Sequence, residues 1–424
     1  MRICYKMSTH YDMLRRLCDT ERGFYGGEIL KRLFVFSILL FLLIGLPGPV
    51  LAKVTIGGRV YVDFYYLDRN KENAQYKKLG NDPFTNTAIQ VPNITRFNVN
   101  WTNEDNVGMF MQMGLGQISG ATTDNTSDGV TLRHAYGWWD ITENFQVLAG
   151  KTTTPISPLL PYQMLGTRSG SLNIIGEGYG ELYSGRFAQI RGTYHITNTI
   201  RLAVALVDPN GAALGNYAPY AQKDIEYQTD TKWPRIDLGL PIYAGPISIF
   251  PSFLYQRRKV DFLTNHPYTD GIDKHIDTYI GSLGVLAGFG PFQFSAEGNW
   301  GQNWSNTGGG MGVSPPARNS AATIHNRRLD DTTTYGWWVD GSYRVGIVTP
   351  HIVYGQMKSE GDKNPMRYKS WFWGFSIPIQ VAKGFNLVPE FMWYDDGDDN
   401  RDAWDNRVDN GKYAIYGVQF QFRF

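Results

Sequence analysis

The connectors of this 424-residue sequence alternate between short and long, and this rhythm restricts the folds that the chain can adopt. From Val54 onward, runs of roughly ten residues or more alternate in polarity, as strands with two different faces do. Most short connectors contain turn-forming residues, and they lie near 104–106, 141–144, 197–199, 244–246, 288–291, 345–347 and 382–384. The long connectors span roughly 69–92, 119–128, 153–184, 209–231, 261–273, 305–329, 361–366 and 398–410. Together they predict about sixteen antiparallel strands.

The final stretch, 412–424, has one apolar face and one polar face. The apolar face holds Ala414, Tyr416, Val418, Phe420, Phe422 and Phe424, and the polar face holds Gly417, Gln419, Gln421 and Arg423. This length and period match a tilted strand that crosses a bilayer with lipid on one side and water on the other. Such a strand can close a ring with residues 54–66, which alternate in the same way. We therefore expect an all-β fold, a transmembrane antiparallel β-barrel; the edge strand of a soluble sandwich is the alternative.

The N-terminal part divides into two predicted segments before the barrel. Residues 29–52 combine Lys31 and Arg32, an apolar run over 33–46 and a small-residue cleavage pattern ending at Ala52, which is typical of a signal peptide. A membrane-spanning helix would need about 20 apolar residues. Residues 1–28 carry both cysteines and suggest a mis-assigned start rather than a folded domain. The barrel, 53–424, then contains no cysteine, so we expect no disulfide, no thiolate-bound metal and no cofactor.

The overall charge excludes one class of partner. Lys and Arg total 40 against 39 Asp and Glu, a net charge of +1, so no global basic charge indicates nucleic acid.

In its connector rhythm and local sequence the chain resembles the sixteen-stranded general porins of bacterial outer membranes. The resemblance rests on the C-terminal alternation, on the stretch 148–155, on the long loop that follows it to Ser184, and on 185–194. It implies that the third external loop folds into the lumen, that the protein forms a homotrimer, and that it lies among the lipid and lipopolysaccharide of a Gram-negative outer membrane. It also implies that the barrel-insertion machinery reads an assembly signal made of Tyr416, Phe420, Phe422 and Phe424.

Alternation assigns most strand charges to the lumen, because Arg or Lys facing lipid at mid-depth costs about 2–4 kcal/mol. Neighbouring strands of the first half contribute a basic arc made of Arg59, Arg96, Arg133, Arg191, Arg201 and Arg235, with Lys151 added if its strand keeps the orientation seen in porins. The acids of the second half are Glu297, Asp340 and Glu390, and the loop 153–184 adds Glu177, Glu181 and Arg168. Loop carboxylates that faced the arc would set up a transverse field at a constriction. The excess of basic residues predicts a mild preference for anions.

Aromatic residues at outward parity indicate girdles at the membrane interfaces. Tyr136, Trp138, Trp337 and Trp373 belong to this predicted outer set, whereas Trp139 and Trp338 have lumen parity. A sugar-stacking slide inside the lumen is the alternative for such rings.

An acidic loop precedes the last strand. Its residues Asp395, Asp396, Asp398 and Asp399 predict a solvated acidic surface, with weak Ca²⁺ or Mg²⁺ binding as the alternative, since hard cations prefer clustered oxygens.

These features predict a passive diffusion channel for ions and small polar solutes. Two alternatives stay open: a channel specific for a sugar or a carboxylate, and a structural sleeve around a periplasmic electron-transfer partner. Enzyme motifs are nearly absent, so we expect no catalysis; a barrel-embedded lipase would use His134, at lipid parity, as its base.

Overall fold

The computed structural model of the protein describes residues 53–117, 128–165, 179–182, 185–209, 227–262, 275–307, 314–325, 328–402 and 404–424. All of them belong to one compact unit, Ala52–Phe424. The predicted extension 1–28 and signal peptide 29–52 lie outside the described residues.

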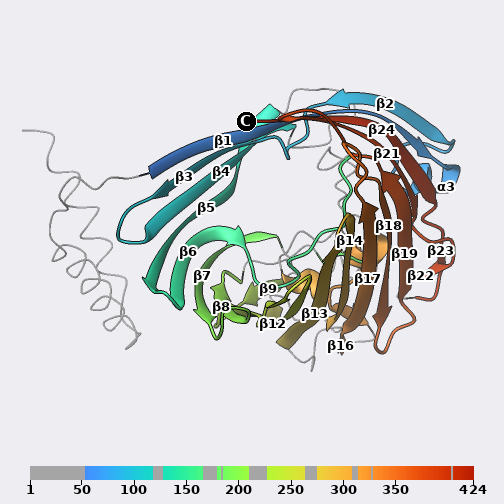
Figure 1. Ribbon diagram of the computed structural model, residues 1–424. Coiled ribbons are helices and arrows are strands. Elements are labelled where there is room, and N and C mark those ends of the chain that lie inside the picture. The colour runs from blue at the N-terminus through green and yellow to red at the C-terminus, as the bar shows by residue number, and fades with distance from the viewer. Residues whose placement is uncertain are drawn as a thin grey trace, which may run out of the picture. The chain divides into compact units, whose positions relative to one another are not determined.

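The described strands form a closed antiparallel β-barrel of sixteen positions, which confirms the predicted fold class (Figure 1). In chain order the positions are β1 (Lys53–Arg69), β2 with β3 (Phe84–Gln90 and Arg96–Thr102), β4 (Val107–Gln117), β5 (Asp128–Thr142), β6 (Phe145–Thr153), β7 (Arg186–His195), β8 (Arg201–Val207), β9 with β10 and β11 (Tyr227–Asp230, Arg235–Gly239 and Ile242–Ala244), β12 (Ile247–Phe262), β13 (His275–Phe289), β14 (Phe292–Gln302), β17 (Thr332–Tyr343), β18 (His351–Gly361), β19 with β20 (Arg367–Ser376 and Ile379–Ala382), β21 (Phe385–Asp395) and β24 (Lys412–Arg423).

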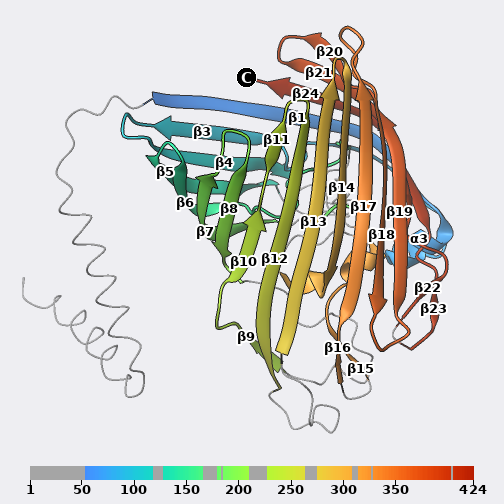
Figure 2. The ribbon, with the colours of Figure 1, turned by 60° about the horizontal axis from the view of Figure 1, so that its bottom comes forward.

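The ring closes between the first and last strands, as the alternation of residues 412–424 predicted. β1 pairs with β24 from Arg59↔Arg423 to Arg69↔Tyr413, and the two strands lie side by side in both ribbon views (Figures 1 and 2). Because the last strand pairs with the first, the barrel has no open seam there.

Short turns and long loops alternate around the ring, and most lie where the sequence placed them. The first long loop is shorter than predicted, because β2 begins at Phe84 and pairs with the second half of β1 from Asp63↔Gln90 to Arg69↔Phe84. The remaining elements lie in loops: α3 (Lys71–Tyr76), the 3₁₀-helix η2 (Trp304–Thr307), α4 (Pro315–Arg318), the hairpin of β15 (Thr323–His325) with β16 (Arg328–Asp330), and the hairpin of β22 (Asn400–Arg401) with β23 (Arg407–Val408). None of the helices in the described part of the chain is long and apolar enough to cross a bilayer.

Burial alternates along the strands and separates an inner from an outer face. In β17, Trp338 and Asp340 are buried, whereas Trp337 and Tyr343 on the opposite face are exposed. On β18 next to it, the outward Ile352 is 72% exposed, as expected of a side chain that faces lipid in a membrane barrel. Trp338 thus has the inner position that its parity indicated.

A β-bulge in β5 breaks this alternation. Gln112 pairs with His134 and Met113 with Leu132, so Arg133 is the extra residue and both Arg133 and His134 point inward. All later residues of β5 therefore exchange faces relative to the sequence prediction. Tyr136 and Trp138 share the inner face, while Trp139 is 50% exposed on the outer face. The predictions for these three rings and for His134 were wrong for this reason.

Two apolar clusters inside the barrel join loop residues to the wall. One is a cluster of ten buried residues, in which Leu165 and Tyr179 of the loop between β6 and β7 pack with wall residues that include Phe372, Tyr394 and Tyr413. The other packs Ile156 and Leu182 of the same loop with Leu254, Ile280, Trp304, Ala317 and Met357. The described parts of this loop are therefore held by hydrophobic contacts as well as by the hydrogen bonds described next.

Candidate functional site

Buried carboxylates of the second half of the barrel bind the backbone of the loop between β6 and β7. Glu390 on β21 accepts hydrogen bonds from the N–H groups of Met164 (3.0 Å) and Leu165 (2.8 Å), and from the Ser376 hydroxyl (2.6 Å). Asp340 on β17 accepts from the Tyr162 N–H at 2.8 Å.

Glu297 on β14 extends the same pattern toward the start of the loop. It accepts from the Ser157 hydroxyl and from the Leu159 N–H at 3.4 Å. The three wall acids predicted for the lumen thus lie on the inner face, and each is bonded to the loop. Each of these bonds satisfies a donor whose burial without an acceptor would be costly.

A cavity of about 550 Å³ lies between this loop and the barrel wall, where residues of β13, β14, β17 and β18 line it together with residues of the first half. Loop residues Leu159 to Met164 form one side of it. Along the other side, arginines extend from the last strand through β1, β3 and β5 to the start of β7: Arg423, Arg59, Arg96, Arg133 and Arg186. Among the described residues, Asp340 is the only acidic side chain in the cavity lining, and it also bonds His351 Nδ1 at 3.0 Å. The lining therefore has a large excess of positive charge.

Three of these arginines occupy one row across adjacent strands. Arg59 pairs with Arg423 on one side and with Arg96 on the other. Among the described residues their hydrogen-bond acceptors are neutral: Tyr61 Oη for Arg59, the Ile94 carbonyl for Arg96, and Gln421 Oε1 for Arg423. Like charges directly opposite one another destabilise a sheet. Since no carboxylate in the described structure offsets them, these guanidinium groups can attract an anion.

Arg133 and Arg186 complete the arginine lining, and each bonds to a neighbouring side chain of the wall. Arg133 Nε donates to Gln112 Oε1 at 2.9 Å, and Arg186 Nε lies 3.0 Å from His134 Nε2. The other ring nitrogen of His134 lies 2.9 Å from Thr152 Oγ1. His134 is thus part of the inner wall, not an outward-facing base.

The remaining predicted basic residues lie outside the cavity. Arg235 is fully buried and forms a bidentate pair with Asp237, with distances of 2.9 and 2.7 Å, so its charge is neutralised. Arg201 stacks over the Tyr243 ring. Arg191 on β7 lies on the inner face, opposite Leu148 of β6. Lys151 on β6 lies opposite Ala135 of β5 and Ala188 of β7.

The predicted loop charges are only partly described. Glu181 is buried beside Leu182, whereas Arg168 and Glu177 lie outside the described residues. Glu181 is not part of the cavity lining, and the wall carboxylates bind the loop instead.

Sequence reasoning missed Arg186 as a lining residue. Arg186 has the parity of Ile190, which is 60% exposed, so strict alternation gives no reason to count it among the lumen residues. Its position directly after Gly185, which has a φ of 83°, was the available signal that the chain changes direction there.

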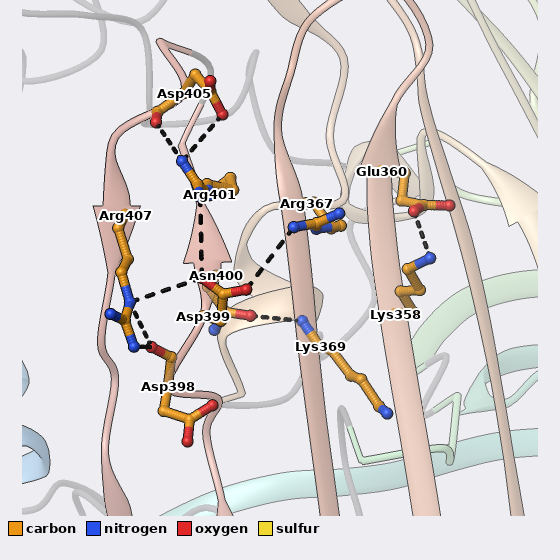
Figure 3. Close-up of polar contacts among 10 residues, drawn as sticks. All are labelled: Lys358, Glu360, Arg367, Lys369, Asp398, Asp399, Asn400, Arg401, Asp405 and Arg407. Carbon is orange, nitrogen blue, oxygen red and sulfur yellow. Dashed lines mark hydrogen bonds and ion pairs between the residues drawn. The ribbon is translucent and has the colours of Figure 1, made fainter.

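The acidic loop before β24 is offset by basic groups on the rim (Figure 3). Asp399 lies 3.6 Å from Arg407, 3.9 Å from Arg367 and 4.0 Å from Arg401. Asp395 and Asp398 lie 3.1 and 3.9 Å from Lys412.

Asp396 differs from these surface acids because it is completely buried. It accepts from Tyr179 Oη at 2.5 Å and from Asn73 Nδ2 at 3.1 Å, which joins three loops. Burial raises the pKa of this carboxyl, although nearby Lys77 opposes the shift. Within the described ranges, no three metal-ligating side chains converge at this loop or elsewhere.

The closed antiparallel barrel of sixteen positions is the fold of the outer-membrane porins. Similarity to solved structures supports this class at the level of fold. The outer membrane channel DcaP of Acinetobacter baumannii matches with a TM-score of 0.63 at 18% identity, over 88% of this chain and 97% of that one. The anion-selective porin from Comamonas acidovorans gives 0.55 at 13% identity, over 88% and 100%.

A third match is the outer membrane protein OmpT of Vibrio cholerae in its trimer form. It gives a TM-score of 0.50 at 12% identity, over 88% of this chain and 99% of that chain. No protein-family model matches the sequence, and no curated protein matches it either.

Proposed function

We propose that the protein is an outer-membrane porin, a passive diffusion channel for ions and small polar solutes with a preference for anions. The observation that carries this proposal is the row Arg96, Arg59 and Arg423, whose charges no described carboxylate offsets at the cavity. Rings of charge select ions by electrostatics in a narrow pore. Transport of this kind makes and breaks no bond, so the protein is not an enzyme in this proposal.

The loop between β6 and β7 is the proposed constriction. Its backbone N–H groups donate hydrogen bonds to Glu297, Asp340 and Glu390, and these bonds support an inward fold that narrows the lumen on the side facing the arginines. Arg59, Arg96, Arg133 and Arg186 are the proposed selectivity residues, with Arg423 closing the row. In this arrangement the wall carboxylates position the loop and contribute little field to the passing ion.

The cellular setting follows from the same proposal. Residues 29–52 would direct export, and the barrel would reside in the outer membrane of a Gram-negative bacterium in contact with lipid and lipopolysaccharide. A homotrimer is proposed as well; the Vibrio cholerae protein with this fold is described in a trimer form.

Reversal potentials in a salt gradient across a planar bilayer test the anion preference. The triple variant Arg59→Gln, Arg96→Gln, Arg423→Gln is expected to lose most of the chloride preference of the wild type. Arg201→Gln is the matched control, because Arg201 lies outside the cavity over Tyr243. Cation preference in the wild-type channel would overturn the proposal.

The carboxylate-specific channel is the second candidate, and the excess of arginine in the cavity favours it over a channel for neutral sugars. Saturable block of ion current by a carboxylate would support it. The sleeve for an electron-transfer partner predicts instead that a haem protein co-purifies with the barrel.

A further inference from the structure

Three aromatic rings form a continuous ladder on the inner wall of β4 and β5. The ring centroids of Phe110 and Tyr136 are 5.6 Å apart, and those of Tyr136 and Trp138 are 5.9 Å apart. The interplanar angles are 45° and 46°, so neighbouring rings are tilted and are not stacked face to face. Part of each ring face therefore stays free of its neighbour. The ladder extends from the arginine-lined cavity toward the 143–144 turn.

The wall of the barrel is shaped to carry these rings. The extra residue Arg133 turns Tyr136 and Trp138 inward, although aromatic residues of membrane barrels commonly face outward at the interfaces. Gly108 lies directly under Trp138: a Cβ at this position would be 2.1 Å from the indole ring. The indole can therefore lie close against the strand. All three rings remain half-buried, so part of each is accessible from the lumen.

Cationic groups lie at both ends of the ladder. At the cavity end, His134 contacts Phe110 with a centroid distance of 6.0 Å and binds Arg186, next to Arg133. At the other end, Leu148 of β6 lies between the two strands, opposite Trp138 on β5 and opposite Arg191 on β7. The buried Nε of Arg191 has no hydrogen-bond partner among the described residues.

We propose that this wall is a binding subsite for aromatic carboxylates on their way through the channel. The flat ring of the solute stacks on Tyr136 and Trp138, and its carboxylate passes from Arg133 and Arg186 to Arg191. An arginine fork matches carboxylate geometry, and offset stacking adds an attraction that a saturated ring does not receive. A neutral sugar would use the rings but not the arginines. The inference rests on the proposed channel function and names a solute class for it.

Block of single-channel current by added solutes tests the subsite. Benzoate is compared with cyclohexanecarboxylate, which has the same charge and a similar size but no π system, and with maltotriose, which is neutral. Benzoate should block the wild-type channel at a concentration about three- to tenfold lower than the blocking concentration of cyclohexanecarboxylate, because aromatic pairs attract one another by a free energy of this size. Equal block by the two carboxylates, or stronger block by maltotriose, would overturn the proposal without any variant.

Variants then assign the effect to the ladder. Tyr136→Leu with Trp138→Leu should abolish the difference between the two carboxylates, and Arg191→Gln should weaken the block by both. Trp337→Leu, on the outer face, is the matched control and should change neither. A preference for benzoate that survives in the double variant would also overturn the proposal.

The same measurements distinguish failure of the proposed channel function from failure of the aromatic subsite. If the wild-type protein does not conduct, or prefers potassium over chloride, the channel proposal itself is wrong. If it conducts and selects chloride, but does not discriminate benzoate from cyclohexanecarboxylate, only the aromatic subsite is wrong.

Discussion

Arg59 and Arg423 lie directly opposite one another where the first and last strands close the barrel. Directly opposed like charges cost roughly 0.2–1 kcal/mol relative to neutral pairs. Because this pair lowers the stability of the barrel, we expect the two arginines to serve transport rather than folding.

Replacing one member of this pair should therefore change stability and selectivity in opposite directions. Arg423→Gln is expected to raise the midpoint of thermal unfolding slightly, by relieving about 0.2–1 kcal/mol of repulsion, and to lower the chloride preference. Thermal unfolding followed by circular dichroism and bilayer reversal potentials measure the two effects. A variant that is both less stable and unchanged in selectivity would show that Arg423 has a packing role.

The loop after β6 should loosen when its carboxylate anchors are removed. Glu390→Ala leaves the buried N–H groups of Met164 and Leu165 without their acceptor, at a cost of about 1–3 kcal/mol for each group. We expect a larger and noisier single-channel conductance. Glu360→Ala on the rim, where Glu360 pairs with Lys358, is the control and should leave the conductance unchanged. A quiet, wild-type conductance in Glu390→Ala would argue against the anchoring role.

The contact between loops at Asp396 should strengthen as the pH falls below neutrality. Burial raises the pKa of Asp396 above its ordinary value of 3.8, so the folded loops bind a proton more readily than the opened loops do. Between the ordinary and the raised pKa, the folded state holds more protons, and stability is lost as pH rises.

Hydrogen exchange in residues 396–411, corrected for the intrinsic rate at each pH, measures this contact. Protection should increase as the pH is lowered from 7 to 4 in the wild type and depend less on pH in Asp396→Asn. Lys77, whose pKa burial lowers to about 8, titrates above this range. Protection that decreases on acidification in the wild type but not in the variant would reverse the assigned sign.

Phe424 is expected to matter for assembly more than for transport. Its N–H donates to the Gly58 carbonyl at 3.2 Å, and its own carbonyl accepts from the Gly58 N–H at 3.1 Å, while its ring is 74% exposed. Deleting Phe424 should reduce the amount of heat-modifiable, folded barrel in membranes and leave the conductance of each assembled channel nearly unchanged. Phe289→Ala, another exposed outer ring, is the control. Equal losses in the two variants would contradict a specific role for the terminal residue.

The sequence was sufficient to predict the barrel because two independent patterns agree on it. The connector rhythm predicts the number of strands, and the alternation in residues 54–66 and 412–424 predicts the strands that close the ring. The side of the barrel wall on which a side chain lies was also predictable where the alternation is uninterrupted, as for Asp340 and Trp337 on β17.

Two features of the site could not be read from alternation alone. The extra residue at Arg133 has no distinctive composition, so the reversal of Tyr136 and Trp138 appears only in the register with β4. Likewise, the role of Glu390 as a loop anchor depends on residues 225 and 226 positions away in the chain. Long-range pairs of this kind follow from the closed ring, not from local sequence.

The bulge at Arg133 also lets the inner wall of β5 hold one more cation than strict alternation allows. Removing the Arg133 codon would leave Leu132 opposite Met113 and His134 opposite Gln112, so alternation would be regular and His134, Tyr136 and Trp138 would still face inward. The bulge thus adds a guanidinium group to the surface that a solute meets without taking a place from the rings beside it.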